Sequence, residues 1–537
     1  MHHLPRSKIA LIFIFAVFIG TAARAQFLDQ IGLTTLRAVT TNLDGAGVYV
    51  GQAEAAYPNF EANPSVVGQP ASLFTWIATT SSITGISSYI PAPAMSGTFP
   101  NSVGAELPHA NDVGKGLYGT SYGVATNVAH VNNYDAETFY YHYVYYNNAI
   151  AERIVNQSFT FGTNDDSINM NYDNYAAQHG VLFVSGAGFN NSPVWSPATC
   201  YNGIGVGVFN NPGSPFGPTA DGRSKPDITA SGFPDTVTSY STPMVSGAAA
   251  LLLQAGLRGD GGASTNAATD IRTLKALLLN GAVKPADWTN TSATPLHPRY
   301  GAGVLNVYNS YEQLAGGKHG YIASTTVTAG GAHRPNGATG TVGVLSGWDF
   351  NTNTSSSLPS AQDGVKHYYF NVTNATGNAA FTATATLVWN RQQNQAGINN
   401  LDLYLYDTAS SNLVMCSTSL VDNVEHVFVP RLPPGRYDLQ VLMNASGINP
   451  ITNSEPYALA WEFFSESLSI APAGTNVALT WPVYPAGFVL ESVTGLTPPA
   501  VWSTNNLPAP AVTNHQNYLL INNTNGNQFF RLRRPNF

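Results

Sequence analysis

The stretch "VTSYSTPMVSGAAALLLQAG", residues 237–256, places hydroxyl side chains and a proline directly before small and then leucine-rich residues. The small residues 247–250 and the leucines 251–253 predict a slim helix that is apolar on nearly every side and therefore buried. We expect Pro243 to lie in the first turn of this helix, where backbone amides lack helical partners and proline is tolerated. The hydroxyls then stand at the amino end of a buried helix.

The amino end of a buried helix favours one kind of chemistry. Its unpaired amides and the positive pole of the helix dipole stabilise negative charge that develops nearby. A serine presented there can act as a nucleophile whose oxyanion is already accommodated. The alternative interpretation of the same residues is that Ser239 or Ser241 only caps the helix.

The nucleophile interpretation gains weight from a resemblance. The residues "TS" at 238–239 and "PMVSG" at 243–247 resemble the segment of subtilisin-like serine peptidases, the subtilases, in which Gly-Thr-Ser precedes Pro-x-Val-x-Gly. Val237 stands where that family has glycine. Further phrases resemble the family in its own order: "GVYVGQAEA" (47–55), "HANDVGKGLYGTSYGVATNVAHV" (109–131), "ERIVNQSF" (152–159), "HGVLFVSGAGFNN" (179–191), "GRSKPDITASG" (222–232) and "RYGAGVLNVYNSYE" (299–312).

The resemblance implies a catalytic triad of Glu54, His109 and Ser239 in an exported endopeptidase that forms an acyl-enzyme. Histidine would take the hydroxyl proton and return it to the leaving amine, and the carboxylate would fix the imidazole tautomer. Glutamate replaces the family's aspartate, so its strand has to sit slightly back or the histidine has to shift. Asp44 is the rival acid, but Asp-Gly before a strand is a turn signal, so we favour Glu54.

The resemblance also implies the substrate-binding residues. Ser158 and Phe159 match the strand that lies along the substrate. The straight alignment puts Phe189 at the position of the oxyanion asparagine, with Asn190 one residue later. We expect either a one-residue bulge that brings Asn190 into the oxyanion hole, or a hole that relies on the Ser239 backbone amide alone. No cofactor is implied, and no stretch of the sequence shows the ligand loop of a calcium site.

The composition excludes several classes of protein. Charged residues make up 10% of the 537 residues and hydrophobic residues 44%, which argues against disorder. The net charge is −8 and the 22 lysines and arginines form no basic run, so we expect no nucleic-acid partner. The expected partners are protein or peptide substrates, and the sequence does not indicate an oligomeric state.

The first 25 residues predict export. Arg6 and Lys8 precede an apolar run from Ile9 to Ile19, and "ARA" ends at Ala25, the expected cleavage site. The run is shorter than the ~20 residues that a membrane anchor needs, so we expect no stable membrane insertion after cleavage. The predicted location is secreted or extracytoplasmic, at a bacterial surface or in the periplasm. The short distance from Ala25 to the first predicted strand leads us to expect no large propeptide. We interpret Cys200 and Cys416 as structural thiols.

The pattern of elements predicts the architecture. Alternating strand and helix patterns favour an α/β domain with a mainly parallel sheet, and the strand patterns "TATATLVW", "LDLYLYD" and "RYDLQVLM" favour a β-sandwich behind it. The sandwich resembles carboxy-terminal domains of secreted bacterial peptidases, of the pre-peptidase or P-domain kind. The predicted units are a signal peptide (1–25), a subtilisin-like domain (26–319), the sandwich (320–465) and a small all-β domain (466–537).

Two other functions stay open at this stage. The departures at Glu54, Phe189 and Val237 allow a catalytically impaired protein that uses this fold for surface binding or adhesion. "GTSYG" at 119–123 satisfies the Gly-x-Ser-x-Gly pattern of α/β-hydrolases, with Ser121 as the nucleophile. That pattern requires a strand before the serine and a helix after it, and the local sequence does not favour this context.

Overall fold

The structure is a computed structural model, and it describes most of the chain after the predicted signal peptide. The described residues are 27–55, 57–79, 94–330, 333–356, 361–373, 380–445, 452–465, 467–482, 488–505, 507–513, 516–522 and 527–533. The predicted signal peptide (1–25) lies outside these ranges. Within these ranges, no helix is both long enough and apolar enough to cross a bilayer.

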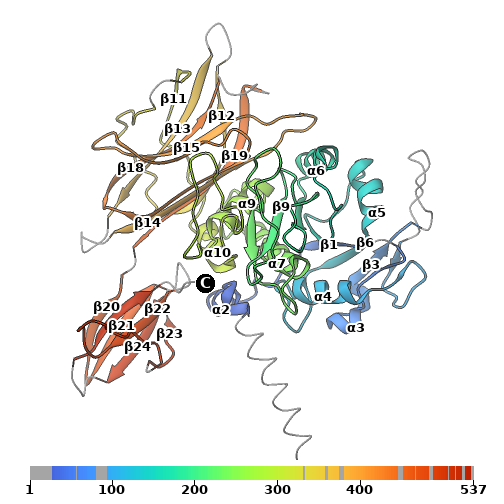
Figure 1. The fold of residues 1–537 in the computed structure, drawn as a ribbon, viewed down its shortest axis with the longest axis horizontal. Helices are drawn as coiled ribbons and strands as arrows, with labels where there is room; N and C mark the ends of the chain where they lie inside the picture. The colour runs from blue at the N-terminus through green and yellow to red at the C-terminus, as the bar shows by residue number, and fades with distance from the viewer. Residues whose placement is uncertain are drawn as a thin grey trace, which may run out of the picture.

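The first domain is built on an eight-stranded sheet with the order β10-β9-β8-β7-β1-β6-β3-β4 (Figure 1). All neighbouring strands pair in parallel except β3 and β4, which pair antiparallel at one edge. The strands are β1 Tyr49–Glu54, β3 Phe74–Ile77, β4 Met95–Ser96, β6 His130–Asp135, β7 Ile154–Gln157, β8 Leu182–Gly186, β9 Ile204–Val208 and β10 Ile228–Ala230. A short parallel pair, β2 Asn59–Glu61 and β5 Ala105–Glu106, lies outside this sheet.

Helices cover this sheet, and the longest of them is α7, Thr238–Arg258. It contacts β7, β8, β9 and β10 as well as helix α4, so it occupies the centre of the domain. Its residues from Ser241 to Gly256 are all buried, as the sequence pattern predicts. The other helical segments are α2 Leu33–Val39, α3 Pro64–Val67, η1 Ala71–Leu73, α4 Pro108–Leu117, α5 Ala136–Thr138, η2 Phe139–Tyr145, α6 Asp166–His179, α8 Thr265–Ala268, α9 Ile271–Asn280 and α10 Val307–Ala315.

The segment just after the predicted cleavage site belongs to this domain's core. Phe27, Ile31 and Leu36 are buried in the same apolar cluster as α7. The Phe27 ring stacks on Phe233 with 5.8 Å between ring centroids, and the Val307 amide donates to the Ile31 carbonyl. Residues 27–36, at the beginning of the domain, therefore pack against its end, where α10 begins.

Two antiparallel sheets form the β-sandwich, with strand orders β11-β13-β18-β15-β16 and β12-β19-β14-β17. The predicted alternation is confirmed in β15, because Leu401, Leu403 and Leu405 all join the buried core between the sheets. The strands are β11 Ala323–Thr328, β12 Ser346–Thr354, β13 Gln362–Val372, β14 Phe381–Trp389, β15 Leu401–Asp407, β16 Leu413–Ser417, β17 Val424–Leu432, β18 Gly435–Met443 and β19 Ser454–Ser465.

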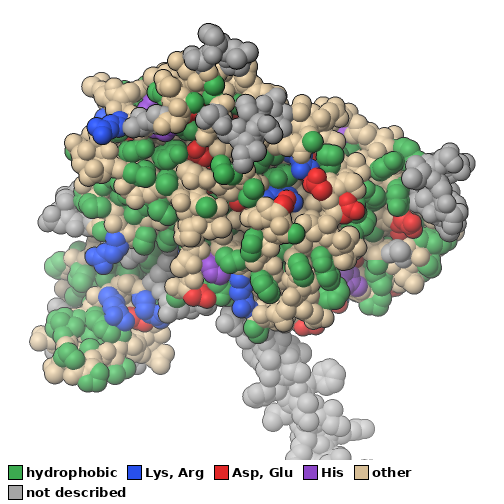
Figure 2. Space-filling model, turned by 45° about the horizontal axis from the view of Figure 1, so that its top comes forward, with side chains coloured by type: hydrophobic (Ala, Val, Ile, Leu, Met, Phe, Trp, Pro, Cys, Tyr) green, Lys and Arg blue, Asp and Glu red, His purple; other side chains and the backbone are tan. Residues whose placement is uncertain are grey.

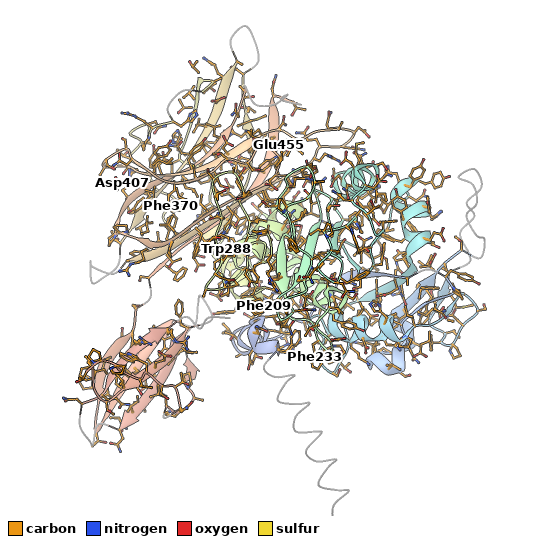
Figure 3. The ribbon with its side chains drawn as sticks, viewed as in Figure 1. Phe209, Phe233, Trp288, Phe370, Asp407 and Glu455 are labelled. Atoms are coloured by element: carbon orange, nitrogen blue, oxygen red, sulfur yellow. The ribbon has the colours of Figure 1, made fainter. Side chains whose placement is uncertain are left out.

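The sandwich shares a core with the first domain. Strands β14 and β19 pack on helix α9, and their residues Val388, Ala458 and Ala460 belong to the same buried cluster as α7 and α9. Trp348, on β12, is fully buried and donates its indole N–H to the Leu314 carbonyl of α10 at 3.0 Å. Figure 3 shows Trp288 where these two parts of the chain meet. The domain boundary predicted at residue 319 falls between α10 and β11. The hydrophobic core is continuous across this boundary.

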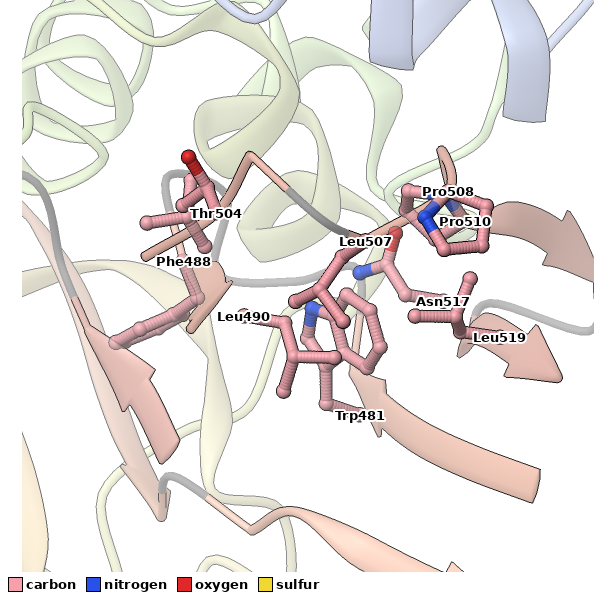
Figure 4. A pocket seen from close by; sticks show the side chains of 10 residues that line it. Trp481, Phe488, Leu490, Thr504, Leu507, Pro508, Pro510, Asn517 and Leu519 are labelled. Carbon is pink, nitrogen blue, oxygen red and sulfur yellow. The ribbon is translucent and has the colours of Figure 1, made fainter. Parts of the chain in front are cut away.

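A small all-β module ends the chain, with sheets β20-β21-β24-β23 and β22-β25. Its core is a separate small cluster around Leu479, Trp481 and Leu519. A pocket of about 200 Å³ opens beside Trp481, walled by Phe488, Leu507 and two prolines (Figure 4). The strands are β20 Ser469–Ala473, β21 Asn476–Pro482, β22 Val489–Val493, β23 Ala511–Thr513, β24 Gln516–Asn522 and β25 Phe529–Arg533. On the face shown in Figure 2, charged side chains are scattered thinly among uncharged ones over the whole molecule.

Candidate active site

The site is assembled where strands of the parallel sheet end. Glu54 is the last residue of β1, Ser158 follows the last residue of β7, and Gly186 is the last residue of β8. Because the carboxyl ends of parallel strands lie at one edge of the sheet, these residues come together there although they are far apart in sequence. Helices α4 and α7 begin at the same edge and bring His109 and Ser239.

Glu54 and His109 form a direct pair. Helix α4 begins at Pro108, and a proline in the first turn costs no helical hydrogen bond. His109 is thus the second residue of the helix, and its Nδ1 lies 2.8 Å from Glu54 Oε2. The Glu54 side chain is fully buried, whereas the His109 side chain is 33% exposed. The carboxylate therefore fixes one nitrogen of the ring and leaves the other available to react.

The pair changes the proton affinity of the imidazole. Burial by itself lowers the pKa of His109. The hydrogen bond that the ring makes to Glu54, together with the negative charge of Glu54, outweighs this effect, and the charge of Asp112 adds to it. The pKa of His109 is therefore raised above its ordinary value. A general base with a raised pKa holds its proton more firmly once it has taken it.

Helix α7 starts earlier than the sequence analysis predicts. Its first residue is Thr238, so Pro243 lies in the helix interior and not in the first turn, which corrects that prediction. A proline at this position has no N–H to donate to the carbonyl of Ser239, four residues earlier. The Ser158 hydroxyl donates to that carbonyl instead, at 2.9 Å. The proline thus frees the Ser239 carbonyl for a bond that ties the helix to the end of β7.

The residue before helix α7 makes no capping hydrogen bond, so the Ser239 amide N–H stays available to a substrate. The N-cap is Val237, whose side chain makes no capping bond, so the interpretation that Ser239 or Ser241 caps the helix is wrong. The Ser241 hydroxyl donates to the carbonyls of Gly207 and Thr238. No carbonyl or side chain in the described part of the chain accepts the Ser239 N–H. This amide lies in the first helical turn, where it can stabilise an oxyanion.

Close contacts between two helices set the distance between His109 and Ser239. A Cβ on Gly116 of α4 would lie 2.5 Å from the terminal methyl group of Met244 and 3.2 Å from the Pro243 ring of α7, so the two helices pack closely at this glycine. Tyr240, the residue after Ser239, packs its ring 5.6 Å from the His109 ring. Neither His109 nor Ser239 Oγ makes a hydrogen bond to the other among the described residues. Such bonds are often long in structures without substrate and shorten in the complex.

A pocket of about 140 Å³ opens directly beside Ser239. The predicted substrate-binding residues Ser158 and Phe159 line it. A Cβ on Gly186 would lie 3.2 Å from the Thr242 hydroxyl, so glycine there lets the end of β8 approach the start of α7. The residues that line the pocket are Ser158, Phe159, Thr160, Gly186, Gly188, Phe189, Val237, Thr238 and Ser239. None of these lining residues carries a charge.

The structure places Asn190 away from this pocket. Phe189 lines the pocket, 54% exposed and edge-on to Trp195, and Asn190 follows it in an exposed turn. Asn190 and Asn191 both have positive φ, which turns the chain away immediately after Phe189. Asn190 is therefore not among the residues that line the pocket, and the donor beside the pocket is the Ser239 amide.

Asp44 and Ser121, the alternative acid and the alternative nucleophile, lie outside this site. Asp44 accepts hydrogen bonds from the Ala46 amide and from Asn127 in the turn before β1, at the opposite end of that strand from Glu54. Ser121 lies in a turn that follows helix α4, so the strand that the α/β-hydrolase pattern requires before it is missing. In the described ranges, no group of three or more His, Cys, Asp or Glu side chains is arranged to hold a metal ion.

Sequence reasoning missed three residues of the site. Gln52 donates a hydrogen bond to Glu54, and Tyr118 donates one to Gln52. The Tyr240 ring packs against the His109 ring. Gln52 carried a usable signal, because a glutamine in the middle of an otherwise apolar buried strand needs buried hydrogen-bond partners. Tyr240 gave none, since its position beside His109 depends on how the two helices cross.

A family model matches part of the chain. The subtilase family model matches residues 110–303, a range that contains Ser239 but begins just after His109. The predicted fold class, a subtilisin-like parallel-sheet domain followed by all-β regions, is confirmed. No curated protein matches the chain.

Several solved structures are similar to parts of the chain. The prenylagaramide maturation protease PagA is 18% identical over 53% of this chain and 99% of its own, with a TM-score of 0.36. A protease from Pseudoalteromonas arctica is 14% identical over 53% of this chain and 94% of its own, with a TM-score of 0.34. Tripeptidyl peptidase 2 is 12% identical over 72% of this chain and 47% of its own, with a TM-score of 0.31.

Proposed function

We propose that this chain, whose residues 110–303 match the subtilase family, is a serine endopeptidase that cleaves proteins or peptides with Glu54, His109 and Ser239 as its catalytic triad. The observation that carries this proposal is the pairing of buried Glu54 with partly exposed His109 at 2.8 Å, beside the start of α7. Val237, Phe189 and Glu54 differ from the family pattern, but they leave this pairing and the Ser239 position in place.

The proposed reaction follows the roles that the geometry offers. The neutral Nε2 of His109 takes the proton of the Ser239 hydroxyl as its oxygen attacks the peptide carbonyl. The imidazolium that forms is stabilised by Glu54 through Nδ1 and then donates its proton to the leaving amine. The acyl-enzyme that remains is hydrolysed by water that His109 deprotonates in the same way.

The developing oxyanion is stabilised mainly by the backbone. We assign this role to the Ser239 N–H in the first turn of α7, with the helix dipole behind it. Asn190, the side-chain donor suggested by the sequence, reaches the oxyanion only if the turn at 189–191 rearranges around a substrate. Removal of a preformed side-chain donor in such a hole costs about 2.7–4 kcal/mol of transition-state stabilisation, so we expect a slow enzyme.

The acyl side of the substrate occupies the pocket beside Ser239. Its uncharged lining favours an apolar or small polar side chain before the scissile bond, and Phe159 provides an apolar wall. We propose that the enzyme acts outside the cytoplasm, because its first 25 residues have the pattern of a signal peptide and Phe27, just after the predicted cleavage site, is buried. Amino-terminal sequencing of the secreted protein is expected to begin at Gln26.

One experiment separates this function from the alternatives. Purified wild-type protein is expected to cleave casein and to react with a fluorophosphonate at Ser239, and Ser239→Ala is expected to abolish both. Ser121→Ala serves as the matched control and should retain cleavage and labelling, because Ser121 lies in an exposed turn. A wild-type protein that is folded but neither cleaves nor labels would instead support a binding or adhesion role for this fold.

A further inference from the structure

We propose that Gln52 is a positioning residue of this active site, and that the site is built for glutamate and not for aspartate at residue 54. The inference rests on the proposed function, since it concerns how the proposed triad is held. Gln52 lies two residues before Glu54 on β1, so both side chains project from the same face of the strand. Both are fully buried.

Both the nitrogen and the oxygen of the Gln52 side-chain amide make hydrogen bonds. Its nitrogen donates to Glu54 Oε1 at 2.9 Å and to the Ala110 carbonyl at 2.9 Å. Its oxygen accepts the hydroxyl of Tyr118, which is also fully buried. One amide therefore joins the acid, the backbone beside His109 and the carboxyl-terminal end of helix α4.

These bonds determine which way the amide points. If the amide were turned over, its oxygen would face the Glu54 carboxylate and the Ala110 carbonyl, and the Tyr118 hydroxyl would face an N–H group. The hydrogen bonds to Glu54 and Ala110 would be lost at once, each at a substantial cost, and the Tyr118 hydroxyl would lose its acceptor. Burial raises the pKa of Tyr118 well above its ordinary value, so its hydroxyl remains a donor at any pH at which the enzyme works. The orientation of Gln52 is thus fixed.

A fixed Gln52 in turn fixes the Glu54 carboxylate. Oε1 accepts from Gln52 and Oε2 accepts from His109 Nδ1, so the two oxygens are held by two donors from two elements. Glutamate has one more rotatable bond than aspartate and would otherwise lose more conformational freedom on holding the imidazole. Aspartate at this position is one methylene shorter and cannot reach both donors from the same backbone.

The alternative interpretation is that Gln52 only satisfies buried groups and has no effect on the imidazole. Both interpretations predict some loss of stability when Gln52 is replaced. Only the positioning role predicts a change in the ionisation of His109, because a carboxylate free to rotate spends less time on Nδ1. The hydrogen bond that raises the pKa of His109 is then weakened, and this pKa falls.

The test uses Gln52→Met, which keeps the length of the side chain and removes its hydrogen bonds. We expect kcat to fall about 10- to 100-fold with KM changed less than twofold, as for loss of an interaction made mainly in the transition state. The acid limb of the kcat/KM profile is expected to move to lower pH. Gln313→Met is the matched control, because Gln313 is also a buried glutamine, and among the described residues its side chain bonds only to Asn280 and Glu462, outside the site.

Glu54→Asp completes the test through a double-mutant cycle. We expect it to lower kcat at least tenfold in the wild-type background and clearly less in the Gln52→Met background, where the second donor is already gone. Retention of kcat within threefold in Gln52→Met, or an acid limb that does not move, would overturn the proposal. So would a Glu54→Asp enzyme that is as active as wild type.

A measurement without turnover keeps this test separate from the proposed function. The His109 resonance, assigned by its loss in His109→Asn, is expected to titrate at lower pH in Gln52→Met than in wild type. An equal pKa in both proteins would refute the positioning role even if no substrate were ever cleaved. A failure of Ser239 to label or to support cleavage would refute the proposed function instead.

Discussion

Asp112 tunes His109 from one helical turn away. It lies three residues after His109 on α4, and its charge contributes to the raised pKa of the imidazole, after the larger effects of burial and Glu54. A general base must be unprotonated, so activity falls as pH drops through this pKa. Asp112→Asn removes a charge that favours the imidazolium, and we therefore expect the acid limb of kcat/KM to shift to lower pH.

The pH–rate profile of Asp112→Asn checks this directly, and measurement at high salt concentration is a useful control. Asp112 is partly exposed and pairs with Lys115, so screening should reduce the difference between variant and wild type. A limb that moves to higher pH would contradict the proposed role of His109 as the base.

Asn190 provides a second test at the residue scale. Because it lies outside the pocket beside Ser239, we expect Asn190→Ala to lower kcat less than tenfold. A preformed oxyanion donor would cost about a hundredfold or more. Comparison of the inhibition constants of a peptide aldehyde with wild type and variant checks the same point, since the aldehyde forms an oxyanion at Ser239. A loss of two orders of magnitude would show that the 189–191 turn rearranges and that Asn190 completes the hole.

At the scale of elements, the sequence predicted types and order better than exact starts. The alternation of leucines in 401–405 and the small residues of 247–250 determine which side of each element is buried, and both predictions are confirmed. The start of α7 was misplaced because Val237 caps the helix without a side-chain bond, which leaves no local signal. Gln52 was missed although a glutamine in a buried strand is a usable signal, because the sequence does not show which groups it bonds. Its partners come from helix α4, 58 residues or more along the chain, and only folding brings them near.

Strand β19 carries a buried acid whose ionisation opposes folding. Burial raises the pKa of Glu455 to about 7, and the hydrogen bonds from Asn399 and Gln392 only partly offset this. Figure 3 shows the residue within the sandwich. A carboxyl with a raised pKa binds its proton more tightly in the folded state, so its stabilising contribution is present below its unfolded pKa and is lost as pH rises through about 7.

Glu455→Gln is therefore expected to stabilise the protein at pH 8, on the order of 1–3 kcal/mol, and to have little effect near pH 5. The amide keeps an oxygen that can accept from Asn399 and Gln392, so packing and these bonds are preserved. Denaturant unfolding at both pH values measures the difference. Equal effects at pH 5 and pH 8 would show that the carboxyl does not titrate in this range.

Across the whole molecule, the peptidase domain and the sandwich are bound by polar groups as well as by a shared core. Asn280, at the end of α9, accepts hydrogen bonds from Thr384 and Thr386 of β14, both at 3.0 Å. Asp422 accepts from the Ser224 amide at 2.7 Å, and Tyr201 lies between the guanidinium groups of Arg223 and Arg391. The sandwich therefore acts as a structural part of the peptidase and not as a loosely tethered appendage.

The small carboxy-terminal module differs in this respect. Its core is a separate hydrophobic cluster. Phe464 of the sandwich contacts Phe488 of the module, with 6.1 Å between ring centroids. Removal of residues 467–537 is therefore expected to leave the melting temperature of the rest within about 2 °C, and casein cleavage unchanged. Removal of residues 320–537 exposes the apolar face of α9 and leaves Asn280 without the two threonines.

We expect the longer deletion to melt more than 10 °C below wild type or to aggregate, because each lost buried hydrogen bond costs about 1–3 kcal/mol and the lost core adds to this. Calorimetry of the two truncated proteins beside wild type measures the difference. Asn280→Ala is the matched point variant, and it should lower the melting temperature in the full chain but much less in the chain that lacks residues 320–537. If the longer deletion melts like wild type, the sandwich does not stabilise the peptidase, and its place behind the catalytic domain has to be explained by contacts with substrates or surfaces.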